Sequence, residues 1–285
     1  MNDVIALAVG LVLGALLAWL GYRGGLLSRS GLLAVVGLSI LVFGLGGWPW
    51  GALLVVHWLG TGLWARYGAA YKRSLGERFT AGSRRSWQQI LASLGWGAVL
   101  VVLHRLAPAN ISIVAAFVGA IATATADIWA TELGVLNAKP PRVLTSRRSV
   151  PAGTPGAISP LGMVAALAGA WLVGFLGLLF PVIGAWIKGQ SWSRPLLWLP
   201  ISATIGGVAG CLVDSFLGAT AQGVYYCERC EKLCENRLHA CGERAQQVRG
   251  WSWLTNDGVN LVSTVVGAAI TAGCMAWLAQ TLIWW

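Results

Sequence analysis

Eight long apolar runs constrain this chain more than any other feature of its sequence. Each is close to the roughly 20 residues that a helix needs to cross a bilayer. In keeping with this, 56% of the 285 residues are hydrophobic and only 11% are charged. Because a lipid-exposed backbone must satisfy its own hydrogen bonds, we predict an all-α, polytopic membrane bundle of about eight spans, forming one domain over residues 1–285. The runs cover residues 4–22, 31–46, 48–66, 88–106, 109–130, 158–180, 195–219 and 258–282.

The basic residues predict how the bundle is oriented. When the connecting segments are assigned to alternating sides, all but three of the 20 Lys and Arg residues fall on one side. The exceptions are Arg105, Lys188 and Arg194. The positive-inside rule makes the basic side cytoplasmic, so eight spans put both termini outside. This one-sided charge also favours an anionic ligand such as a phosphate or nucleotide, whereas no motif for binding nucleic acid is present.

Three aspartates lie within or at the ends of the predicted spans, where charge is costly and usually functional. Asp127 and Asp214 come late in spans that run toward the cytoplasm, and Asp257 begins the last span, which leaves from it. We therefore expect the three carboxylates at one depth near the cytoplasmic face, where they suit Mg²⁺ bridging to phosphates. The alternative is that they pair with basic residues or cap helices. Glu132 lies about 140° around a regular helix from Asp127 and is expected to face elsewhere.

A basic segment that contains Pro and Gly follows the fifth run, at residues 139–159. Its sequence, KPPRVLTSRRSVPAGTPGAIS, leads into a helix near Ala157. Backbone amides of a Gly-containing turn before a helix N-terminus favour phosphate, and Arg147 and Arg148 are placed to add charge-assisted contacts. The spacing of a P-loop is missing. The prediction of a phosphate site therefore depends on the acidic helix that precedes this segment.

A cysteine-rich insert lies between the seventh and eighth runs, at residues 225–250. In YYCERCEKLCENRLHACGE, a CxxC pair is followed by further thiols and an imidazole. Disulfides are disfavoured in the cytoplasm, whereas this donor set suits a structural, tetrahedral Zn²⁺. The alternative is a set of free thiols in an ordinary loop. The candidate ligands are Cys227, Cys230 and Cys241, with His239 or Cys234 as the fourth.

Several sequence blocks, in their order and spacing, resemble one integral membrane family. The blocks are ADIWATELG, PAGTPGAISPLG, DSFLGATAQ, the cysteine insert and VRGWSWLTNDGVN. The family was long carried as a domain of unknown function, and it includes plant and cyanobacterial phytyl-phosphate kinases and animal transmembrane protein 19. The likeness covers roughly residues 30–282. Pro155 and Ala157 stand where the usual block has glycines.

The resemblance implies transfer of a nucleotide phosphoryl group to phytyl phosphate, which yields phytyl diphosphate for tocopherol-type synthesis. The catalytic positions that it implies are Asp127, Glu132, Asp214, Asp257 and Asn260. Besides Arg147 and Arg148, the positions implied to contact phosphate or nucleotide are Gly153, Thr154, Gly156, Ser215, Gln222 and Asn256. The order of an Asp–Glu helix, a basic stretch and a Gly-rich loop is also similar to the CTP-dependent dolichol and phytol kinases, which makes CTP a candidate nucleotide.

The sequence therefore predicts a membrane kinase for an isoprenyl or phytyl monophosphate. Mg²⁺, a nucleoside triphosphate, a structural Zn²⁺ and the lipid bilayer are its expected partners. Three alternatives stay open: a transporter or lipid scramblase, a phosphotransferase that uses a CDP-linked lipid, and a zinc-stapled assembly factor. Transport is disfavoured because the acids gather at one face rather than at the midplane and no internal repeat is evident. The CDP-linked reaction is disfavoured because a DGxxAR-type cluster is missing.

Overall fold

The structure is a computed structural model that describes residues 3–74, 84–239 and 241–282. Within these residues, eight long helices correspond one for one to the apolar runs, which confirms the predicted helical membrane class. They are α1 (Asp3–Arg23), α2 (Arg29–Leu41, continued by the π-helical turn η1, Val42–Gly46), α3 (Trp48–Arg66), α5 (Trp87–Leu106), α6 (Ile111–Gly134), α7 (Pro160–Ile187), α8 (Leu199–Thr220, after the 3₁₀ turn η3, Arg194–Trp198) and α9 (Asn256–Leu282). A short helix, α4 (Ala69–Ser74), follows α3.

Seven of the long helices are long and apolar enough to span a membrane, and α3 is the one outside this group. It carries His57 and ends on Arg66, and both lower its hydropathy. The His57 Nδ1 atom lies 2.9 Å from the Thr125 hydroxyl of α6, and both side chains are buried. That hydroxyl donates to the carbonyl of Ile121, so it accepts from His57, whose proton is therefore on Nδ1. A buried polar contact thus holds α3 in the bundle.

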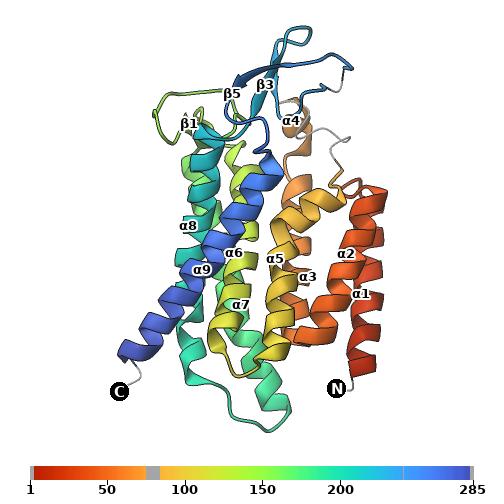
Figure 1. The fold of residues 1–285 in the computed structure, drawn as a ribbon, viewed down its shortest axis with the longest axis vertical. Helices are drawn as coiled ribbons and strands as arrows, with labels where there is room; N and C mark the ends of the chain where they lie inside the picture. The colour runs from red at the N-terminus through yellow and green to blue at the C-terminus, as the bar shows by residue number, and fades with distance from the viewer. Residues whose placement is uncertain (1–2, 75–83, 240, 283–285) are drawn as a thin grey trace.

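Both ends of the described chain lie at one end of the bundle, and the small β-sheets extend from the other end (Figure 1). The connections that carry most of the basic residues emerge at the sheet end, as the alternating assignment requires. Arg78, which contributes to the predicted cytoplasmic charge, lies outside the described residues.

The central helix of the bundle is α6. Of its most apolar window, 67% is buried, compared with at most 44% in the other candidate spans. It packs against α7, α8 and α9 through small residues, which let membrane helices approach closely. The Thr123 side chain of α6 fills the space where a Cβ would lie at Gly210 of α8 and at Gly267 of α9. This three-helix contact fixes the depth of the residues around it.

Two helices extend beyond their predicted ends. α6 continues to Gly134 rather than stopping at residue 130, so Thr131 and Glu132 are helical. α7 continues through Pro181 to Ile187. Neighbouring helices can satisfy the carbonyl that a proline frees within a membrane bundle, so Pro181 does not end the helix.

Short strands form two sheets at the same end of the molecule. β1 (Arg142–Val143) pairs antiparallel with β2 (Ala157–Ile158), which closes the segment after α6 into a loop. The cysteine-rich insert forms a three-stranded antiparallel sheet in the order β4–β3–β5, more than the predicted hairpin. Its strands are β3 (Val224–Cys227), β4 (Lys232–Cys234) and β5 (Gln246–Arg249).

Candidate functional site

A cavity of about 80 Å³ lies between α6, α7 and α8, near the end of the bundle that carries the sheets. Asp127 of α6 and Asp214 of α8 line it, and the loop residues 153–156 line it as well. One water needs roughly 10–15 Å³, so this cavity has room for several waters or a small hydrated group. The structure therefore brings together two of the three predicted aspartates and the predicted Gly-containing loop.

The two cavity aspartates lie at the same depth because α6 and α8 run in the same direction. Thr123 of α6 contacts Gly210 of α8. Asp127 and Asp214 each follow this contact by one turn, which is about 6 Å along either helix. The Ser263 hydroxyl of α9 lies 3.4 Å from Asp214 Oδ2 and adds a polar neighbour that the sequence did not single out.

The loop that faces the aspartates depends on two glycines. Gly153 and Gly156 have φ values of +86° and +77°, in the region that favours glycine. A Cβ at Gly156 would overlap the backbone of Ala219, so the loop backbone lies directly on the last turn of α8. The strand pair β1–β2 and the bond from the Leu144 amide to the Gly156 carbonyl, 3.1 Å long, hold the loop from its other side.

The start of α7 completes the cavity. Ser159 is the N-cap of α7, and its hydroxyl accepts from the Gly162 amide and donates to the Gly134 carbonyl at the end of α6. Ser159 and Gly162 both line the cavity. A helix N-terminus favours negative charge, whereas the two carboxylates favour a cation. The arrangement suits a divalent cation bound together with a phosphate group, as the donor set of two carboxylates and nearby hydroxyls fits Mg²⁺.

The other positions predicted to contact phosphate are distributed differently. Thr154 and Ser215 line the cavity. Arg147 and Arg148 are exposed in the turn between β1 and β2 and are not among the lining residues. Gln222 is buried after the end of α8 and is also outside the lining.

The predicted residues of α9 lie farther out along their helix. Asp257 precedes Ser263 by six residues, or about 9 Å of helix, and is half-buried in the first turn of α9. Asn256 precedes Asp257 by one residue, and Asn260 follows it by three, within the first two turns of the same helix. None of these three residues lines the cavity, although all lie at its end of the bundle.

Glu132 makes an ion pair on another face of α6. Its Oε2 atom lies 2.7 Å from Nζ of Lys72, and the Lys72 side chain is only 2% exposed. The same ammonium donates to the carbonyl of Trp64, in the last turn of α3, at 2.6 Å. Glu132 is not among the cavity residues. This is the orientation that regular helical geometry predicts for it.

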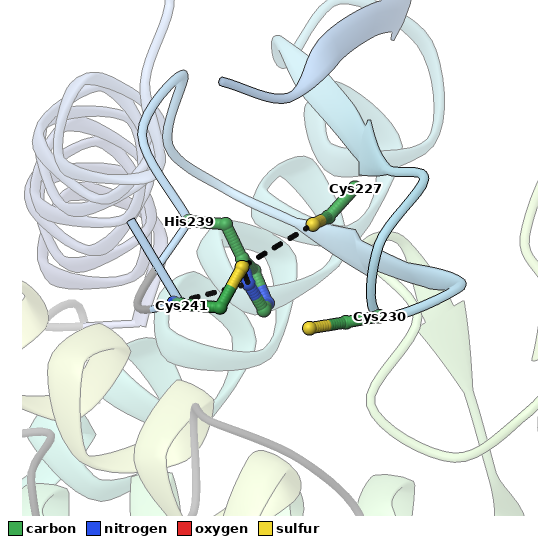
Figure 2. Close-up of side chains that lie close together, drawn as sticks. All are labelled: Cys227, Cys230, His239 and Cys241. Atoms are coloured by element: carbon green, nitrogen blue, oxygen red, sulfur yellow. Dashed lines mark hydrogen bonds between the residues drawn. The ribbon is translucent and has the colours of Figure 1, made fainter. Parts of the chain in front are cut away.

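The cysteine-rich sheet brings four potential metal ligands together. Figure 2 shows Cys227, Cys230, His239 and Cys241 converging, and their ligand atoms all lie within 4.8 Å of one another. The Cys241 sulfur lies 3.7 Å from that of Cys227 and 3.0 Å from His239 Nδ1. A tetrahedron with metal–sulfur bonds of about 2.3 Å has edges of about 3.8 Å, so the donor set fits Zn²⁺.

Cys234, the other candidate for the fourth place, lies apart from this cluster. The register of β3 and β4 places Cys227 opposite Lys232, two residues from Cys234 along the strand. That separation is about 7 Å. The Cys234 thiol instead lies 3.4 Å from the carbonyl of Asn236. Of the two alternatives left open by the sequence, the geometry selects His239.

Two thiols of the cluster have pKa values shifted in opposite directions. The hydrogen bond with His239 lowers the pKa of Cys241 to about 7, with help from the Glu243 backbone. Hydrogen bonding with Cys241, together with burial, raises the pKa of Cys230. A thiolate is the form that binds a metal, so Cys241 is the cysteine best prepared to ligate.

Sequence reasoning missed Arg249, the last residue of β5. Its Nη2 atom donates to the carbonyl of Gly218 at 2.6 Å and to that of Pro155 at 3.3 Å. Partial burial lowers the pKa of this guanidinium, which stays charged at neutral pH. The only signal in the sequence was its place inside a block shared with the resembled family.

The chain is similar to proteins from a plant, an archaeon and a cyanobacterium. A sequence model described as "Integral membrane protein DUF92" matches residues 12–268. Protein PGR of Arabidopsis thaliana is 32% identical over 280 residues, covering 93% of this chain and 95% of its own. An uncharacterised membrane protein of Methanocaldococcus jannaschii is 28% identical over 273 residues, covering 95% and 94%. One from Synechocystis is 23% identical over 255 residues, covering 84% and 79%. No solved structure shows significant similarity to the chain.

Proposed function

The chain belongs to the DUF92 family of integral membrane proteins, and we propose that it is a membrane-embedded kinase for an isoprenyl monophosphate. The terminal phosphoryl group of a nucleoside triphosphate passes to an oxygen of the lipid phosphate, which gives a lipid diphosphate and a nucleoside diphosphate. Phytyl phosphate is the acceptor that the sequence resemblance favours. CTP is one candidate donor.

One observation carries this proposal: Asp127 and Asp214 face a Gly-containing loop and a helix N-terminus across a single small cavity. Acids alone would suit a cation, and amides alone would suit an anion. Their combination at one end of a membrane bundle suits phosphate groups bound together with a cation. A cavity of about 80 Å³ is too small for a whole substrate, so only the reacting groups enter it.

The protein's own task in this reaction is positioning and charge stabilisation. Asp127 and Asp214 would hold Mg²⁺, which supplies positive charge to the phosphates when bound. The amides of Gly153 and Gly156 in the loop, together with the positive end of α7, orient the phosphate that reacts. A phosphate monoester is already a nucleophile near neutral pH, so no side chain has to act as a general base.

The location of the cavity fits a substrate with a lipid tail. It lies near the basic end of the bundle, which the positive-inside rule assigns to the cytoplasm, where nucleotides are available. A prenyl chain bound there can extend along the apolar helices while its phosphate stays at the surface. In the same proposal, Arg147 and Arg148 attract the anionic substrates from outside the cavity.

The test is an assay of the purified protein in nanodiscs with phytyl phosphate, Mg²⁺ and a panel of nucleotides labelled on the terminal phosphate. We expect a labelled lipid diphosphate. Asp127→Asn and Asp214→Asn should each lower the rate at least about 100-fold, because each removes a group that stabilises charge at the reacting phosphates. Glu231→Gln, at an exposed site in the cysteine-rich sheet, is the matched control and should keep the wild-type rate.

Asp257→Asn tests a position for which the family resemblance and the structure predict different roles. Resemblance assigns Asp257 to catalysis, whereas its position about 9 Å along α9 from Ser263 favours a smaller, supporting role toward the nucleotide. We expect an intermediate loss of rate. If no nucleotide yields product while the protein, reconstituted in lipid vesicles, moves lipids between their leaflets, the kinase proposal is wrong and the scramblase alternative replaces it.

We further propose that the cluster of Cys227, Cys230, His239 and Cys241 binds one structural Zn²⁺. Protein purified without chelator should contain about one zinc per chain by elemental analysis. Cys227→Ser combined with Cys230→Ser should abolish the zinc content, and Cys234→Ser, outside the cluster, should preserve it. Equal zinc loss in Cys234→Ser would contradict the ligand assignment.

A further inference from the structure

Arg249 lies where the cysteine-rich sheet meets the cavity. β5 pairs with β3, and Arg249 stands opposite Val224 at the end of β3 that adjoins α8. The other end of β3 is Cys227, a member of the metal-ligand cluster. One strand of about 10 Å therefore connects the cluster to the position of Arg249.

The backbone after Arg249 is held tightly against the end of α8. Gly250 has a φ of +75°, and a Cβ there would overlap the carbonyl of Gln222. The Trp251 amide donates to the carbonyl of Ala221 at 2.8 Å. These contacts leave the Arg249 backbone little freedom, so the direction of its side chain follows the position of β5.

The guanidinium of Arg249 connects two segments that meet at the cavity. The Gly218 carbonyl belongs to the last turn of α8, where carbonyls lack helical partners, and it accepts from Arg249. The Pro155 carbonyl belongs to the cavity loop and accepts from the same nitrogen. The backbones of Gly156 and Gly218 are in direct contact, next to the two carbonyls that accept from Arg249. Arg249 thus bonds both sides of the contact that holds the loop opposite Asp127 and Asp214.

We propose that Arg249 is a positioning residue: it clamps the cavity loop to the end of α8, and the metal-bound cluster holds the strand that presents it. The proposal rests on the cavity being the site of phosphoryl transfer and on the cluster binding zinc. Loss of the metal then loosens a loop that lies about 70 residues or more before the metal ligands in the chain. Occupancy of the cysteine site is in this way coupled to the geometry of the phosphate site.

Hydrogen exchange of the full-length, zinc-containing protein, without nucleotide or lipid, tests the clamp. The reporters are the amides of Leu144, Thr154 and Ala157, whose hydrogen bonds hold the loop. Arg249→Gln should speed their exchange by about tenfold or more, because it removes charge-assisted bonds. Arg249→Lys keeps the charge but lacks the planar fork, so it should restore part of the protection. Arg244→Gln, at an exposed position of the same insert, should leave the loop unchanged.

Two further arms complete the test. Ethylguanidinium corresponds to the part of the arginine side chain that Arg249→Ala removes, so adding it should restore the protection of the loop amides in this variant. If the variant had only lost general stability, the added compound would not restore this protection. Removal of zinc by Cys227→Ser with Cys230→Ser should speed exchange of the same loop amides. Unchanged loop exchange in Arg249→Gln would refute the clamp, and an unchanged loop after zinc loss would refute the coupling to the cluster. Because no substrate is present, absence of kinase activity would not alter these readings.

Discussion

At the scale of single residues, each acid in this chain owes its role to its neighbours. Asp127 and Glu132 are five residues apart on one helix, yet one lines a cavity and the other pairs with a buried lysine. A buried ammonium without a partner is costly, so the burial of Lys72 depends on the counter-charge of Glu132. Lys72 in turn joins α4 to the last turn of α3. This geometry favours a structural role for Glu132.

Glu132→Gln should therefore lower the free energy of unfolding of the detergent-solubilised protein by an amount on the order of 3 kcal/mol, because Lys72 stays buried without a counter-charge. Thermal unfolding measures this as a lower melting temperature. The double variant Lys72→Met with Glu132→Leu should recover much of this loss. Turnover per folded molecule at low temperature should stay near that of the wild type. A well-folded Glu132→Gln protein without turnover would instead place this carboxylate in the reaction, as the family resemblance implies.

At the scale of elements, the depth of the cavity residues is set by helix contacts made through small side chains. Thr123 of α6 occupies the space over Gly210 and Gly267, so α6, α8 and α9 approach closely one helical turn before the two aspartates. Any added atom at this contact would push α6 and α8 apart. The distance between Asp127 and Asp214 therefore depends on the absence of a Cβ one turn away.

Two glycine-to-alanine variants in helix interiors should have opposite effects. Gly273→Ala of α9 adds a methyl group where no atom lies within 4 Å, so it should raise stability slightly, by up to about 1 kcal/mol from helix propensity. Gly210→Ala makes the same chemical change against the Thr123 side chain and should lower both melting temperature and turnover. Thermal unfolding and the kinase assay measure both effects. Equal behaviour of the two variants would show that the contact does not control the cavity.

At the scale of the whole molecule, the site lies near one end of a membrane bundle, and the charge is gathered at that same end. Both ends of the described chain lie at the opposite end (Figure 1). In the proposed reaction, this is the end of the bundle at which a lipid phosphate held at the membrane surface would meet a water-soluble nucleotide. The cysteine-rich sheet extends from the same end and reaches the cavity through Arg249.

Cysteines introduced at the two ends should react from opposite sides of the membrane. Thr145 and Gln190 are both exposed, in connections at opposite ends of the bundle. An impermeant thiol reagent added to intact cells should modify Gln190→Cys, whereas Thr145→Cys should react only after permeabilisation. Mass spectrometry of the labelled peptides distinguishes these sites from the native cysteines. Reaction of both from outside would overturn the predicted cytoplasmic orientation.

The sequence by itself determined the class of fold and the approximate limits of every long helix. Length and apolarity are sufficient for this, because a helix in lipid must satisfy its own backbone hydrogen bonds. The same order of charged and apolar segments placed Asp127 and Asp214 toward one end of the bundle. Glycines at 153 and 156, before a helix, indicated the loop that faces them, because a turn with positive φ favours glycine.

Only the tertiary structure decided which side chains meet. Asp257 was expected beside the other aspartates, but spacing along a chain does not fix how far each helix is shifted along its neighbours, and α9 places Ser263 there instead. His239 rather than Cys234 joins the cluster because strand register carries Cys234 away from Cys227. Arg249 reaches Pro155, which is 94 residues earlier in the chain, and no local pattern encodes such a contact. Hydrophobic pattern records burial along each element, whereas convergence of polar groups depends on how separate elements pack.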